Sequence, residues 1–167
     1  MATSGQRMIS RRRASRISKH TSRRRMARII ALQALYELDC ADHRVEDVLQ
    51  ARLDALAGQR GAHPQVRRYA YRLVNGVREV YPQLDAQIAQ LAPKFPIDQM
   101  AAIDRNILRI ALYEFAVGKQ VPFKVATDEA IRLAKLFGAA HTAQFVNGVL
   151  GALAPLSATS SDEATET

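Results

Sequence analysis

The chain has 167 residues with a net charge of +8 at pH 7, and residues 1–28 hold nine arginines, one lysine and no acidic residue, so the charge is concentrated at the start. No stretch approaches the ~20 apolar residues of a membrane span, and no apolar run follows the basic start as a secretory signal requires. We therefore expect no membrane span and no export signal, and a cytoplasmic location, which the single cysteine also suits.

The basic segment at residues 1–22 is predicted to be a disordered arm. A block of like charge without apolar periodicity does not fold alone and is typical of arms that bind nucleic acid. Two other interpretations are open: a solvated tail that aids solubility and, in a eukaryotic source, an organelle transit peptide, which is also rich in Arg and Ser. At the other end, residues 156–167 are acidic and rich in Ser and Thr, and predict a disordered tail.

Residues 23–155 are interpreted as one helical domain. Apolar residues recur at helical spacing over about residues 23–39, 45–57, 65–80, 83–91, 100–117, 123–137 and 142–153. The third of these segments, for example, is expected to bury Val66, Tyr69, Ala70, Leu73, Val74 and Val77. Pro82 separates an early group of helices from a later one, and no strand-like alternation flanked by hairpin turns occurs. The predicted fold class is all-α, a compact bundle of about seven helices.

The segment at residues 103–153 is the most informative part of the chain. Its first helix is apolar on two faces and must be buried. Pro122 reads as an early helical position, Gly138 as a helix stop and Thr142 as the N-cap of the last helix. Four acidic residues in this part are spaced as helix-surface charges and are expected on a solvated face rather than in a catalytic pair: Asp104, Glu114, Asp128 and Glu129.

Catalytic and metal chemistry find no support in the sequence. His20, His43, His63 and His141 lie far apart without metal-ligand spacing, and Cys40 has no second cysteine near it. The chain has no phosphate-binding glycine loop, serine elbow or dinucleotide fingerprint. We therefore predict no metal, no cofactor and no enzymatic activity.

The remaining class of function is binding, and arginines are the most frequent candidate binding residues. Arg24 and Arg28 are neighbours at i and i+4 on the first helix, and their mutual repulsion indicates an anionic partner. Tyr36 and Phe145 each allow two interpretations, packing in the core or stacking on a nucleic-acid base.

Three segments carry a resemblance to a known family: LRIALYEF at residues 108–115, VPFKVATDEAIRLAKLFG at 121–138 and FVNGVLGAL at 145–153. They resemble the NusB family of bacterial transcription antitermination factors. RRMARIIALQALY at residues 24–36 looks like the arginine-rich first helix of the same family. The resemblance covers roughly residues 23–155, is weakest in the middle third, and implies two packed helical subdomains.

The resemblance also implies a ligand. Members of the family bind single-stranded boxA RNA with the arginine-rich N-terminus, the first helix and the start of the last helix, where arginines hold phosphates and aromatic rings stack on bases. By position, the candidate RNA-binding residues are Arg23, Arg24, Arg25, Arg28, Gln33, Tyr36, His141 and Phe145. For His141, a contact with RNA and no role at all are both open.

A protein partner is implied as well, namely ribosomal protein ten of the small subunit, called NusE in this context. The candidate contacts are Asp104, Arg105 and Glu79, for which ordinary surface charge is the alternative. The implied function is that of an adaptor: the heterodimer captures nascent boxA RNA and tethers it to the RNA polymerase elongation complex with other Nus factors, which promotes processive rRNA transcription.

Three other classes of protein stay open. The first is a general single- or double-stranded nucleic-acid-binding protein without boxA specificity. The second is an enzyme, because NusB-like domains also begin ribosomal RNA cytosine methyltransferases, although we expect no cofactor domain in a chain of this length. The third is an oligomer that self-associates through the RNA face, and the sequence does not distinguish a monomer from a homodimer.

Overall fold

The structure is a computed structural model that describes residues 4–57, 62–119 and 121–154. These residues form seven α-helices and a π-helical turn without any β-strand, which confirms the predicted all-α class. The elements are α1 (Ser4–Cys40), α2 (Val45–Ala57), α3 (Pro64–Glu79), α4 (Tyr81–Leu91), α5 (Ala102–Leu112), the π-helical turn η2 (Tyr113–Val117), α6 (Phe123–Phe137) and α7 (Thr142–Gly151). The predicted acidic tail lies outside the described residues.

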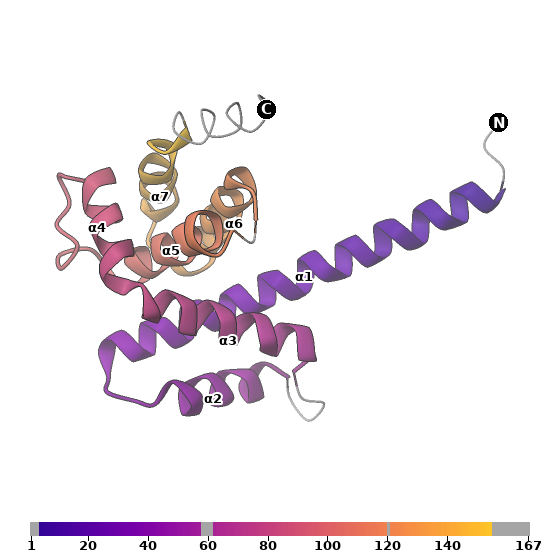
Figure 1. Cartoon of the computed structure of the whole chain (residues 1–167), viewed down its shortest axis with the longest axis horizontal. Helices are drawn as coiled ribbons and strands as arrows, with labels where there is room; N and C mark the ends of the chain where they lie inside the picture. The colour runs from indigo at the N-terminus through magenta and orange to yellow at the C-terminus, as the bar shows by residue number, and fades with distance from the viewer. Residues whose placement is uncertain (1–3, 58–61, 120, 155–167) are drawn as a thin grey trace, which may run out of the picture.

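Helix α1 lies between two groups of helices and contacts both. Helices α2 and α3 pack against it and against each other, and α5 also contacts it. Helix α5 in turn carries α4, α6 and α7. Figure 1 shows these two groups meeting along the C-terminal half of α1, while the N-terminal half projects beyond them.

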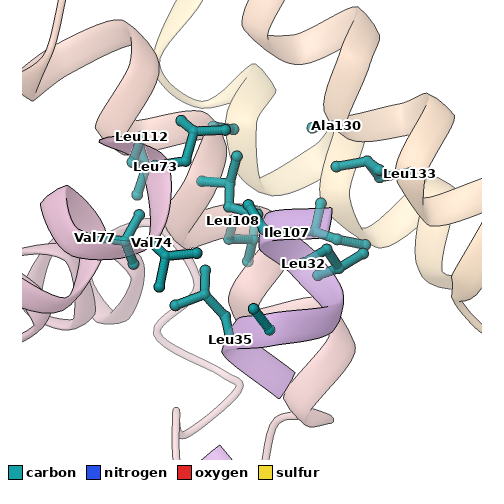
Figure 2. Packing of buried hydrophobic residues seen from close by; sticks show 14 of the residues in the cluster. Leu32, Leu35, Leu73, Val74, Val77, Ile107, Leu108, Leu112, Ala130 and Leu133 are labelled. Carbon is teal, nitrogen blue, oxygen red and sulfur yellow. The ribbon is translucent and has the colours of Figure 1, made fainter. Parts of the chain in front are cut away.

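One continuous hydrophobic core joins the two helical groups. In Figure 2 side chains of α1, α3, α5 and α6 meet in it, among them Leu32, Leu35, Leu73, Val74, Val77, Ile107, Leu108 and Leu133. Each fully buried side chain of this size contributes about 1.5–3 kcal/mol relative to an exposed one. The six residues that the sequence predicts to be buried on α3 are all buried.

The start of α1 differs from the expectation. The sequence pattern predicts a first helix from about residue 23, after a disordered arm, whereas the helix begins at Ser4. Residues 6–30 contain neither Gly nor Pro, and nine of these 25 residues are arginines, which favour the helix. The division of the chain into arm, domain and tail stays a prediction.

The buried helix of the later group also departs from a simple α-helix. It ends in the π-helical turn η2, where the backbone N–H of Gly118 donates to the carbonyl oxygen of Tyr113 at 2.7 Å. Such wider turns often mark functional positions. Here the turn places Glu114 inside the protein, where 1% of the residue is exposed.

Candidate nucleic-acid interface

A buried ion pair fixes α1 to the later helices. Arg28, 3% exposed, donates from Nε to both carboxylate oxygens of Glu114, at 3.0 and 2.9 Å. The Tyr69 hydroxyl of α3 donates to the same carboxylate, and Glu129 of α6 lies 3.5 Å from Arg28 Nη1. The anionic partner that the Arg24–Arg28 spacing indicates is thus supplied, for Arg28, by the protein itself. Arg28 is therefore buried and paired inside the protein, which argues against the RNA contact that the family resemblance implies for it.

The two residues that donate to Glu114, Arg28 and Tyr69, both have raised pKa values. Burial by itself lowers the pKa of Arg28, but the hydrogen bond and charge of Glu114 outweigh it and the pKa is raised overall. Burial raises the pKa of Tyr69, and the negative charge of Glu114 raises it further. Arg28 therefore stays cationic and Tyr69 stays a neutral donor across the physiological pH range.

Three acidic residues that the helical spacing predicts on a solvated face are buried. Besides Glu114, these are Glu129 and Asp104, which are 6% and 7% exposed. Glu129 accepts a hydrogen bond from Arg25 Nε at 2.9 Å, and Asp104 accepts one from the Thr142 hydroxyl at 3.0 Å. Asp128 is exposed as expected. Helical spacing misplaced the buried acids because their partners come from distant parts of the chain.

Arginines from two helices line a groove between α1 and α3. The hollow measures about 240 Å³ and is lined by His20, Arg23, Arg24, Gln65, Arg68, Tyr69 and Arg72, with no acidic residue among them. We call these seven residues the basic groove. Arg23 Nη1 donates to Gln65 Oε1 at 3.0 Å, and the Arg24 guanidinium lies 4.9 Å from the centre of the Tyr69 ring. The groove brings the predicted residues Arg23 and Arg24 together.

The sequence analysis did not predict the residues that α3 contributes to the basic groove. Arg68 and Arg72 stand at i and i+4, so they share a helix face. That spacing is visible in the sequence, and only the packing of α3 on α1 shows that this face meets the basic start of α1.

The other predicted residues of α1 lie apart from the basic groove. The Arg25 side chain is 39% exposed and pairs with Glu129 on α6. Gln33 is half-buried and Tyr36 is 44% exposed. At 1.5 Å per residue, Tyr36 lies about 18 Å along the axis from Arg24. The exposure of Tyr36 is that of a surface residue, and base stacking requires such an exposed ring.

An apolar hollow of about 470 Å³ lies at the start of α7. Its walls include the rings of Phe95 and Phe145, whose centroids are 5.2 Å apart at an interplanar angle of 72°. Lys94 and His141 add polar groups to the same lining. We call these four residues the aromatic hollow.

Phe95 is the aromatic residue of this hollow that the sequence pattern did not single out. It is 54% exposed in the loop between α4 and α5. Its position between Pro93 and Pro96 was an available signal, because prolines restrict a loop and an exposed aromatic residue on a loop is typical of a binding site.

The three predicted contacts with the protein partner differ in their exposure. Asp104 lines a hollow of about 350 Å³ beside His141 and Phe145, but its carboxylate is held by Thr142. Arg105 donates to Asp39 at 3.2 Å, and its side chain is 18% exposed. Glu79 is exposed at the end of α3. Asp104 and Arg105 thus serve internal contacts rather than standing as free surface charges.

Among the residues that the structure describes, no group of three or more His, Cys, Asp or Glu side chains is arranged to hold a metal ion. No helix within the described ranges is long and apolar enough to cross a membrane.

An all-helical fold with a groove lined by four arginines and a hollow with an exposed aromatic ring is typical of a helical protein that binds nucleic acid. Comparison with known proteins agrees. The NusB family model matches residues 25–155. The transcription antitermination protein NusB of Dehalococcoides mccartyi (strain CBDB1) is 43% identical over 136 residues, which cover 80% of this chain and 90% of that protein. The chain belongs to the NusB family of transcription antitermination factors.

Solved structures share the fold. NusB of T. maritima is similar with a TM-score of 0.70 and 31% sequence identity, over 79% of this chain and 90% of that one. A chain in a structure of the antitermination factors NusB and NusE in complex with dsRNA gives a TM-score of 0.71 at 22% identity, over 81% of this chain and 98% of that one. The second likeness concerns the fold alone.

Proposed function

We propose that this antitermination factor binds single-stranded boxA RNA together with NusE and promotes processive rRNA transcription. Within the described structure, the observation that carries the RNA proposal is the aromatic hollow. The exposed ring of Phe95, which Phe145 supports edge-on, offers a face on which an unstacked base can stack, and Lys94 and His141 beside it can hold the phosphate. Because bases in a duplex are stacked and paired, such a hollow favours a single strand.

The proposed RNA contacts are the predicted residues that are at least partly exposed. They are Arg23, Arg24, Arg25, Gln33, Tyr36, His141 and Phe145, and Phe95 joins them. In the proposal, arginines near the start of α1 hold phosphates, and the aromatic hollow holds a base. Arg28 is left out of the set because it is buried and paired with Glu114.

The proposed protein partner is NusE. A chain with this fold occurs in a solved structure of the antitermination factors NusB and NusE in complex with dsRNA. That complex supports NusE as the partner of a member of the same family. Of the three predicted contacts, Glu79 is the exposed one and is retained in the proposal. The heterodimer acts as a binding adaptor without catalysis, in the cytoplasm, between RNA and the RNA polymerase elongation complex with other Nus factors.

The test is fluorescence anisotropy with a labelled boxA RNA and a scrambled strand of the same composition. Both strands are titrated with the protein alone and with NusE, at several salt concentrations. We expect tighter binding of boxA than of the scrambled strand, and a further gain with NusE.

Equal affinity for both strands, with no effect of NusE and a steep loss with salt, would contradict the proposal. That result favours a general nucleic-acid-binding protein, because phosphate contacts carry no sequence information.

A further inference from the structure

We propose that Arg68 and Arg72 of α3 bind the phosphate backbone of the same RNA, so that the basic groove is an RNA contact made by two helices rather than by α1 alone. This inference rests on the proposed RNA binding and adds to it a set of residues and a ligand chemistry, namely the phosphates of a single strand.

The charges of the basic groove call for an anion. Four arginines and a histidine line a hollow of about 240 Å³, and no Asp or Glu lines it. Like charges that the fold holds together make a positive surface, and such a surface attracts a polyanion.

The α1 side of the groove is held in place by α3. Gln65 accepts a hydrogen bond from Arg23, and the Tyr69 ring lies under the Arg24 guanidinium. Tyr69 is itself 7% exposed and bonded to Glu114, so the floor of the groove is part of the core. Side chains that are positioned before binding lose less conformational entropy when an RNA arrives.

The α3 side presents two exposed arginines on one face. Arg68 and Arg72 are one helical turn apart, and both are exposed. The guanidinium group donates in a planar fork that matches phosphate oxygens. Because four guanidinium groups line the groove and the Tyr69 ring is largely covered, the groove suits a phosphate backbone more than a base.

The basic groove adds affinity, but no sequence selectivity, to the proposed RNA site. Phosphate contacts position a strand without reading its sequence. The basic groove therefore raises affinity for any single strand, while selectivity for boxA comes from the aromatic hollow and from NusE.

The test compares two double variants of the full-length protein that lose the same charge from the same helix. The groove variant is R68Q/R72Q. The control is R67Q/R78Q, whose arginines lie outside the groove: Arg67 contacts Gln50 and Tyr71, and Arg78 lies over Tyr81. Anisotropy is measured with boxA and scrambled RNA between about 50 and 200 mM salt, and circular dichroism checks that both variants fold.

We expect the groove variant to lose affinity for both strands by the same factor. Two lost phosphate contacts reduce the salt slope by about 1.4 for a single strand, so across this salt range wild-type affinity should fall about sevenfold more than that of R68Q/R72Q. The control variant should keep a salt slope close to the wild-type value.

Equal salt slopes and equal losses in the two variants would overturn the inference, since net charge alone would then explain them. A loss confined to boxA would overturn it too, because it would indicate base contacts. In both cases wild-type binding to boxA survives, so the proposed function is judged separately: it fails only if the wild-type protein does not prefer boxA.

Discussion

Arg28 Nε lies 2.9 Å from Glu114 Oε2, although the two residues are 86 positions apart in the chain. This buried pair joins α1 to the π-helical turn after α5. Since Tyr69 donates to the same carboxylate and also forms the floor of the basic groove, the pair connects the core to the proposed RNA contact. The orientation of the arginines of α1 thus depends on an interaction with the C-terminal half of the chain.

Replacing Arg28 by methionine should destabilise the protein strongly. The substitution keeps the approximate length of the side chain but leaves the Glu114 carboxylate buried without its cation, which costs about 3–5 kcal/mol. The double variant R28M/E114Q should recover part of that loss, because the buried charge is gone. Urea denaturation measures both, with the exposed Arg67→Met as the control. A loss below about 1 kcal/mol for R28M would show that Glu114 finds another partner.

The Tyr69→Phe variant should change the pH dependence of stability. The pKa of Tyr69 is raised by burial and by Glu114 from its usual 10.0. A raised folded-state pKa adds stability that is present below about pH 10 and is lost as the pH rises, with a slope of up to about 1.4 kcal/mol per pH unit. The substitution removes this component, so we expect a shallower decline above about pH 10.

At neutral pH the same Tyr69→Phe variant should be less stable than the wild type by about 1–3 kcal/mol, because Glu114 loses a hydrogen-bond donor. Chemical denaturation at about pH 7 and at several values from about 10 to 11.5 gives both results. Parallel stability curves for the two proteins over the alkaline range would rule out the proposed role of the Tyr69 hydroxyl.

Replacing Phe95 by alanine should weaken RNA binding with little effect on stability, because the side chain is 54% exposed. Loss of one stacking ring costs about 1–3 kcal/mol of binding free energy. Leu136→Ala is the matched control, since Leu136 is a large apolar residue that is 60% exposed on α6, away from the hollow. RNA anisotropy checks the prediction, and equal affinities for the two variants would count against base binding at Phe95.

Two glycines should respond in opposite ways to alanine. A Cβ atom at Gly76 would overlap the Tyr113 ring, whereas a Cβ at Gly148 meets no atom within 4 Å. We expect Gly76→Ala to destabilise by about 1–3 kcal/mol through overpacking. Gly148→Ala should stabilise α7 by up to about 1 kcal/mol through helix propensity. Thermal denaturation tests the pair, and a stable Gly76→Ala variant would mean that Tyr113 moves freely.

Periodicity predicted the helices and their buried faces well, as α3 illustrates. It failed for the acidic residues. Glu114 and Glu129 have the spacing of surface charges, but each meets an arginine of α1 that lies far away in the chain. Local patterns show which residues share a face of one helix. They carry no information on a partner in a distant part of the chain. For the same reason, the sequence analysis did not include Arg68 and Arg72 in the predicted RNA site.

The amino-acid sequence by itself determined the all-α class, the order of the helices and the resemblance to the NusB family, because these depend on local spacing and on motifs within single helices. Only the tertiary structure decided which arginines are available to a ligand. Arg24 and Arg28 are one turn apart in the same basic run, yet Arg24 lines a groove whereas Arg28 is buried, because the packing of the later helices brings the Glu114 carboxylate to Arg28.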